Sequence, residues 1–293
     1  MTLVIDFGTV NTVAMVDGQL VTVDGGPWLP SVVHEGVVGV DASLLGRGRE
    51  HRDLKARLEP DEVGAVFERV LSAAREQGGD VDEVVVTHPA RWSPERVAVL
   101  TAAAGSPGRR VRTVGEPVAV AAGVPAGEAA LVVDAGGGTW DAAVVRDGVL
   151  RGASSVPVDL DQRIFERVRP SLREAELDDA ARADLLESAR ASKELLSRHD
   201  IAEIVLPDHR AVRLTRTEFE VLIAADVNRL TAAVADVCAG VSVTRVLLVG
   251  GASRVPILAV RLSATTGQHV APDPEPETAV VRGAFLLTRA PEK

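Results

Sequence analysis

Short apolar runs, each closed by a polar turn, recur along the chain and predict β-strands. The first run covers residues 3–5 and ends at Asp6-Phe7-Gly8, a second covers 12–16, and Asp17-Gly18 separates it from a third over 19–23. Asp-Gly between two apolar runs favours a tight hairpin, because both residues tolerate positive φ. The opening of the chain therefore predicts strand, Asp-x-Gly turn, strand, Asp-Gly turn and strand.

The same order of features occurs again near the middle of the chain. An apolar run over 130–133 ends at Asp134-Ala135-Gly136-Gly137-Gly138, a run over 140–145 follows, and Asp147-Gly148 precedes a run that begins at Val149. Two copies of one pattern imply a duplicated architecture with two similar halves. A cleft between such halves would receive one Asp-x-Gly turn from each side.

Helical and strand patterns alternate between and after the two copies. Apolar residues at helical spacing predict a helix over 60–76, and longer patterns predict helices over 177–196 and 217–237. Short apolar strands are expected over 84–87 and 246–249. Strands that alternate with helices are typical of an α/β protein with mixed or parallel sheets.

Composition narrows the class of protein and its partners. The chain has 293 residues, 46% hydrophobic and 25% charged, which suits one large domain or two lobes. Its net charge of -10 argues against a nucleic-acid partner, but backbone N–H groups and a lysine could still hold phosphate. The single Cys238 excludes an internal disulfide. Without a signal peptide or a membrane segment in the pattern, we expect a cytoplasmic protein.

The two Asp-x-Gly turns carry the first candidate chemistry. Gly8 and the run 136–138 would let the backbone approach a ligand and present N–H groups to phosphate oxygens. Asp6 and Asp134 would face each other across the cleft, which suits Mg²⁺ held largely through water. One such turn alone is more simply a tight hairpin capped by its aspartate. The second copy makes a phosphate cradle the better interpretation.

Two further segments could act on a nucleotide. Glu116, within Gly115-Glu116-Pro117, stands at the start of a short helix, where it could cap the helix or orient an attacking water. The turn over 250–256 follows a strand, and its glycines would admit a flat base on which Arg254 could stack. A plain glycine turn explains the second segment equally well.

Taken together, these stretches resemble the ATPase domain of the DnaK-type 70-kDa heat-shock chaperones. The matching motifs are two phosphate motifs, two connecting motifs and an adenosine motif, at residues 5–12, 133–141, 114–117, 276–284 and 248–256. The resemblance implies an actin-like ATPase fold of the α/β class, with two duplicated ribonuclease-H-like lobes around a central nucleotide cleft.

The resemblance also implies the domain boundaries. Lobe I would cover 1–120 with a reduced outer subdomain over 30–75, and lobe II 121–293 with a reduced helical one over about 160–215. Lys293 follows soon after the last motif, so we expect either a stand-alone member or a piece of a longer protein, without the family's peptide-binding domain.

The resemblance implies a role for each residue that stands at a motif position. The Mg²⁺ ligands would be Asp6, Asp134 and Asp141, and the catalytic residues Lys55, Glu116, Asp134 and Thr139. ATP or ADP would contact Gly8, Thr9, Val10, Asn11, Gly136, Gly137, Gly138, Lys193, Ser197, Gly250, Gly251 and Arg254. The chemistry would be in-line phosphoryl transfer to water. Val10 replaces a hydroxyl residue of the family's first phosphate turn, which would weaken one phosphate contact. Arg190 and Glu194 depart from the family pattern where it contacts ribose and adenine, and they leave nucleotide preference open.

The implied function is Mg-ATP binding and slow hydrolysis by a conformational switch in a chaperone-related protein, with a co-chaperone or a C-terminal partner domain as its partner. A non-catalytic nucleotide-sensing interaction module stays open because of the three departures. An actin-like filament-forming ATPase would share the paired turns, but the Gly-Gly-x-x-Arg-x-Pro sequence around Arg254 favours the chaperone branch. A sugar or acetate kinase is the weakest alternative, because no sugar-binding constellation is visible.

Overall fold

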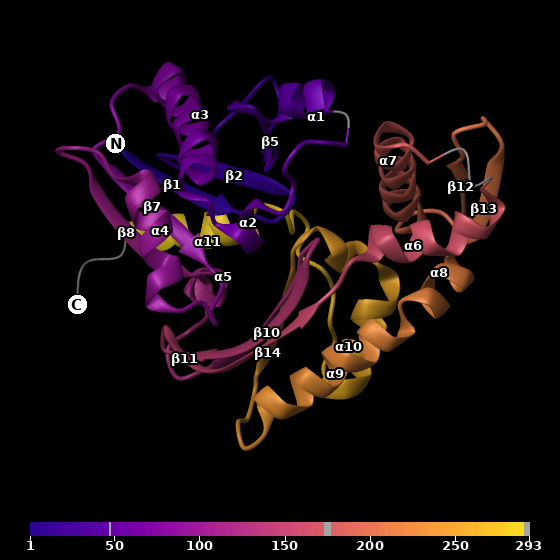
Figure 1. Ribbon diagram of the computed structural model, residues 1–293. Coiled ribbons are helices and arrows are strands. Elements are labelled where there is room, and N and C mark those ends of the chain that lie inside the picture. Colours follow the sequence, from indigo (N-terminus) through magenta and orange to yellow (C-terminus); the bar gives the residue numbers. More distant parts are fainter. Residues whose placement is uncertain (47, 173–176, 290–293) are drawn as a thin grey trace.

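The computed structural model describes residues 1–46, 48–172 and 177–289. The elements form two halves, each built on a mixed β-sheet (Figure 1). The first half contains β1 to β8, α1 to α5 and the last helix, α11. The second half contains β9 to β14 and α6 to α10. The protein is therefore of the mixed α/β class that the alternating pattern predicted.

The first sheet has the strand order β3-β2-β1-β7-β8, with β4 paired to β2. β1 runs antiparallel to β2 and parallel to β7, which is parallel to β8. The hairpin predicted at Asp17-Gly18 is present, with φ of 47° and 88°. The strand bounds are β1 Thr2–Phe7, β2 Asn11–Val16, β3 Gln19–Leu20, β4 Leu29–Pro30, β7 Glu83–His88 and β8 Arg110–Gly115.

The second sheet has the order β11-β10-β9-β14 and repeats the arrangement of the first. β10 is antiparallel to both neighbours, and β14 is parallel to β9. A parallel bridge from Leu248 to Pro272 stands where β8 stands in the first sheet. The two copies of the sequence pattern thus form equivalent strands. The bounds are β9 Ala129–Ala135, β10 Thr139–Arg146, β11 Val149–Pro157 and β14 Arg245–Val249.

Two helices cover one face of the first sheet. α3 (Pro60–Gly78) confirms the predicted helix, and α4 (Pro94–Ala104) packs beside it. Their apolar faces meet the alternate residues of β1 that point to this side, and Phe7 stacks edge-on against Phe67 with ring centroids 5.6 Å apart. This core supports β1 from one side and fixes where its last residues lie.

The other face of the first sheet is covered by α5 (Glu116–Val120) and α11 (Ala279–Arg289). Gly283 allows the two helices to touch, since a Cβ there would lie 2.0 Å from the carbonyl oxygen of Ala119. The described chain therefore ends on the first sheet, although the sequence analysis grouped 121–293 in one lobe. The resemblance gave the lobes as continuous ranges, whereas tertiary packing decides which sheet covers the last helix.

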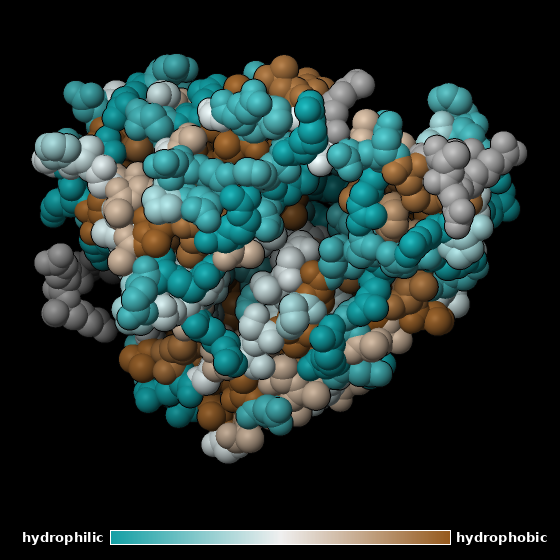
Figure 2. Space-filling model, in the orientation of Figure 1, coloured by the Kyte–Doolittle hydropathy of each residue, from teal (hydrophilic) through white to brown (hydrophobic). Residues whose placement is uncertain are grey.

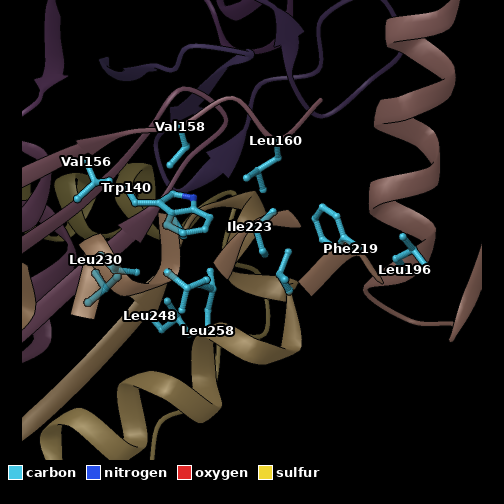
Figure 3. Close-up of a cluster of buried hydrophobic side chains, with 14 of the residues drawn as sticks. Trp140, Val156, Val158, Leu160, Leu196, Phe219, Ile223, Leu230, Leu248 and Leu258 are labelled. Atoms are coloured by element: carbon cyan, nitrogen blue, oxygen red, sulfur yellow. The ribbon is translucent and has the colours of Figure 1, made fainter. Parts of the chain in front are cut away.

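The second half has its own core around Trp140, which is fully buried against residues from several elements (Figure 3). The helix predicted over 217–237 is in fact two helices, because the backbone turns at the fully buried Ile223 (φ −96°, ψ 1°). The bounds are α6 Leu160–Val168, α7 Asp179–Leu196, α8 Arg216–Leu222, α9 Ala224–Cys238, α10 Pro256–Thr266, β12 Ile201–Val205 and β13 Ala211–Thr215.

The segment between β4 and α3 reaches toward α7, and the surface is hollowed between them (Figure 2). A Cβ on Gly48 would lie 2.4 Å from the carbonyl oxygen of Asp179, at the start of α7. The two halves therefore touch above the hollow. The bounds are β5 Val33–His34, β6 Val37–Val38, α1 Val40–Gly46 and α2 Leu54–Arg57. Within the described ranges, no helix is long and apolar enough to span a bilayer.

Candidate functional site

The two Asp-x-Gly turns have the same internal geometry. The Gly8 N–H donates to the carbonyl of Asn11 at 3.1 Å, and the Gly136 N–H donates to the carbonyl of Thr139 at 3.0 Å. A Cβ on Gly8 would lie 2.3 Å from that carbonyl oxygen, so the turn closes only with glycine. Equivalent strands thus end in equivalent turns, as the repeat predicted.

The turns also meet each other between the two halves. A Cβ on Gly137 would lie 2.4 Å from Cγ2 of Val10, and one on Gly138 would lie 2.8 Å from Cγ2 of Thr9. A larger residue on the second turn would displace the side chains of Thr9 and Val10, which pack against Gly138 and Gly137. The structure therefore brings together the residues that the sequence analysis assigned to phosphate binding.

A buried ion pair lies beside the turns. Lys55 of α2 places its Nζ 2.8 Å from Oε1 of Glu116 at the start of α5, with side chains 16% and 7% exposed. Burial favours the neutral amine, but Glu116, Asp6 and Asp134 outweigh it and raise the pKa of Lys55 above its ordinary value. One lysine is therefore shared among three carboxylates that come from both halves.

The carboxylates hold protons more tightly than usual. Burial raises the pKa of Glu116 to about 8, and the charges of Asp6 and Asp134 add to it against the opposing effect of Lys55. Burial also raises the pKa of Asp134 to about 7, with Asp6 and Asp141 as further causes. A cluster with this excess of negative charge takes up protons or an added cation near neutral pH.

The remaining predicted metal ligand lies next to a hydroxyl. Thr139 Oγ1 donates to Oδ2 of Asp141 at 2.7 Å. Asp141, Asp134 and Glu116 line one cavity of about 20 Å³, which is room for about one water. Among the described residues, no three carboxylate, imidazole or thiolate groups converge into a ready metal site. Carboxylate oxygens around a water-sized space are a donor set that would suit Mg²⁺ held largely through its own water.

The glycine turn after β14 lies against the second phosphate turn. Gly250 has a φ of 81°, and a Cβ on it would lie 2.3 Å from Oδ1 of Asp134. Gly251 begins a short 3-10 helix that ends at Arg254. Arg254, expected to stack on a base, forms two hydrogen bonds of 2.8 Å with Glu277. Sequence reasoning missed Glu277, because a partner 23 positions away leaves no local signal.

Lys193 and Ser197, which the resemblance assigns to contacts with ribose and adenine, lie at the C-terminal end of α7. Lys193 pairs with Asp161, and Arg190 pairs with Glu194 at 3.4 Å along the helix. Ser197 is the C-cap residue, directly after the last residue of α7. The structure thus keeps Lys193 and Ser197 on one helix end, but it engages the lysine with a carboxylate that the sequence analysis did not name.

Two residues without an assigned role contact the predicted site. Thr87 Oγ1 donates to Oδ1 of Asp6 at 2.6 Å. Arg96 Nη2 donates to the carbonyls of Lys55 at 2.9 Å and Ala56 at 3.1 Å, and so holds the short helix that carries the lysine. Neither contact could be inferred from spacing, since each joins strands or helices far apart in the chain.

The family assignment follows from comparison with known proteins. The Hsp70 protein family model matches residues 43–289, which include Lys55, Glu116 and the second phosphate turn. The chain belongs to the Hsp70 family. The first phosphate turn precedes the matched range, but it is closed by the same kind of backbone hydrogen bond as the second turn. Membership implies an actin-like ATPase fold and a nucleotide-binding domain, and members of the Hsp70 family are ATPases that bind ATP or ADP with Mg²⁺.

Several relatives within the Hsp70 family are chaperones. The chain is 31% identical over 261 residues to the chaperone protein HscA homolog of Bordetella petrii, covering 80% of this chain and 42% of the relative. It is 30% identical over 251 residues to chaperone protein HscA of Cronobacter sakazakii, covering 78% and 40%. The chain therefore spans about two fifths of the length of these relatives.

Proposed function

We propose that this chain binds Mg-ATP between its two halves and hydrolyses it slowly, as the conformational switch of a chaperone-related protein. The observation that carries the proposal is the convergence of Lys55, Glu116, Asp6 and Asp134 beside the paired glycine turns. The proposed lobes are 1–120 and 121–293, with α11 returning to the first. Nucleotide would join the lobes, and its loss would release them.

The side chains divide the chemistry between binding and positioning. Asp6, Asp134 and Asp141 would hold Mg²⁺ through its water, and the bound ion would neutralise phosphate charge. The turn N–H groups and the Lys55 ammonium would bind phosphate oxygens. Glu116, with its raised pKa and its place on the water-sized cavity, would orient the attacking water.

The base and ribose would lie between the glycine turn and the end of α7. Gly250 and Gly251 leave room for a flat ring, and the ion pairs of Arg254 and Lys193 border the same region in the proposed arrangement. These pairs must rotate or share their partners when nucleotide binds. We further propose a cytoplasmic protein that acts with a co-chaperone or a C-terminal domain as its partner, in keeping with its Hsp70 relatives.

A second candidate is a nucleotide-sensing module without turnover. Val10 favours it, because its methyl group packs toward Gly137 at a place where a hydroxyl would supply a phosphate contact. This candidate keeps binding and closure but removes the chemical step.

Calorimetric titration with ATP and ADP, with and without Mg²⁺, tests binding first. Single-turnover hydrolysis then separates the two candidates. We expect Lys55→Met and Glu116→Gln each to slow cleavage at least about 100-fold, since each removes a group that binds or orients a reactant. Glu76→Gln, an exposed carboxamide change on α3, is the control and should cleave like the parent chain. Binding without cleavage would support the sensing module, and no binding would refute both.

A further inference from the structure

The two equivalent aspartates are held differently in the two halves. Asp6 and Asp134 are each the penultimate residue of their strand, β1 and β9. Each strand has one parallel neighbour. The register pairs Val249 of β14 with Asp134, and it pairs Val86 of β7 with Ile5, so that Thr87 and Asp6 follow as the next residues of their strands. Thr87 and Val249 therefore hold equivalent positions in the duplicated sheets, one with a hydroxyl and one without.

The hydroxyl makes a direct contact with its aspartate. Thr87 is 1% exposed, and its Oγ1 donates to Oδ1 of Asp6 at 2.6 Å. A hydrogen bond of this length to a carboxylate is a strong, charge-assisted one. It engages Oδ1 and restricts the rotation of the carboxyl group, which leaves Oδ2 as the oxygen without this donor.

The second half lacks this contact. Val249 is 2% exposed, packs with Val132 and Val145, and has no hydrogen to donate. Across the described chain, no group donates a hydrogen bond to the carboxylate of Asp134, whose Oδ1 lies against Gly250. Among the described residues, the duplicated site therefore has one carboxylate that accepts a hydrogen bond from a buried hydroxyl and one that does not.

We infer that Thr87 is a positioning residue for the magnesium site, which orients Asp6 toward a metal-bound water and acts only through Asp6. The inference rests on the proposed function. Groups behind a metal ligand commonly set its orientation, and their removal weakens metal binding by about 10-fold or more. A purely structural hydroxyl would instead affect folding, or nucleotide binding with and without metal alike.

The test is the affinity for ADP measured by calorimetry in Mg²⁺ and in EDTA. Thr87→Val keeps the side-chain shape and reproduces the residue that the second half carries, so the fold should tolerate it. We expect its affinity in EDTA to equal that of the parent chain, and its gain from Mg²⁺ to fall about 10-fold. Thr87→Ser should restore the gain. Thr101→Val, which removes a hydroxyl bonded to a helix carbonyl of Val97, should leave it unchanged.

Each outcome decides the matter. A full Mg²⁺ gain in Thr87→Val, or an equal loss of affinity in Mg²⁺ and EDTA, would overturn the positioning role while leaving the proposed nucleotide site intact. A parent chain that binds ADP no better with Mg²⁺ would overturn the proposed function and the role of Thr87 with it. Thr87→Ala should show the same smaller gain in affinity from Mg²⁺. It replaces Thr87→Val in the test if the valine variant unfolds at a lower temperature than the parent chain.

Discussion

Removal of the Lys55 charge should destabilise the ligand-free protein more than removal of the Glu116 charge. Lys55 is the cation that opposes the raised pKa values of Asp6, Glu116 and Asp134. Lys55→Met keeps most of the apolar stem but leaves these buried carboxylates uncompensated. Breaking a buried pair in this way costs about 3 kcal/mol. We therefore expect the free energy of unfolding to fall by about 3 kcal/mol at pH 7.5.

Glu116→Gln removes a negative charge from the cluster, whereas Lys55→Met removes the positive one. It weakens one hydrogen bond, at a cost of about 1 kcal/mol, but it also removes repulsion with Asp6 and Asp134. The two effects offset each other, so we expect a net change below about 1 kcal/mol. Lys193→Met is the matched control for the lysine change, because Lys193 is also 16% exposed but pairs with one carboxylate, Asp161, that is 29% exposed.

Urea unfolding at pH 7.5 and pH 5.5 measures these differences. The raised pKa values of Glu116 and Asp134 mean that the folded protein holds protons that the unfolded chain releases. Their contribution to stability is therefore present at low pH and is lost as the pH rises toward 7 and 8. The deficit of Lys55→Met should shrink at pH 5.5. A deficit independent of pH, or one equalled by Glu116→Gln, would refute the shared-lysine interpretation.

Three further changes have expected outcomes. Gly283→Ala should lower the free energy of unfolding by about 3 kcal/mol, because the new Cβ would collide with the backbone of α5. Gly64→Ala, in open space on α3, should raise the free energy of unfolding by about 0.5 kcal/mol. Thermal unfolding of both variants measures the difference. Gly48→Ala should disturb the contact between the two halves at Asp179, because the new Cβ would meet its carbonyl oxygen. A loss of about 1.4 kcal/mol at this contact would speed ADP release about 10-fold, which stopped-flow displacement measures. Gly36→Ala has a similar positive φ but open space, and should leave release unchanged. Binding of Mg-ADP at pH 6.5 should release a proton, because Asp134 has a raised pKa of about 7 and would lose its proton to the bound cation. Calorimetry in buffers of different ionisation heat measures the released protons, and their number should be smaller in Asp134→Asn.

Local pattern predicted the parts of the fold that local physics controls. The hairpin at Asp17-Gly18 and the turn at Gly8 could be located because positive φ and close backbone approach select particular residues. The helix over 60–76 could be located because its apolar residues recur at the period of a helix. The repeat predicted equivalent strands, and the two sheets share their order. Lys55 had no such local signal. It stood out only as one of three lysines in an arginine-rich chain, and the family resemblance gave it a role.

Longer-range features could not be read from the pattern. The interruption between helices α8 and α9 at Ile223 depends on the burial of this residue in a core built from many elements. The packing of α11 on the first sheet depends on which face of that sheet the other helices leave uncovered. The pair of Arg254 with Glu277 and the contact of Thr87 with Asp6 join residues 23 and 81 positions apart. Such contacts exist only after the sheets have formed.

The sequence by itself determined the two glycine turns, the carboxylates that end the equivalent strands, and the repeat that predicts a cleft between them. Only the tertiary structure decided that Lys55 meets Glu116 across 61 positions and is shared with Asp6 and Asp134. The reason is that turn conformation depends on neighbouring residues, whereas charge coupling depends on distance and burial. Those quantities are set where segments distant in the chain pack together.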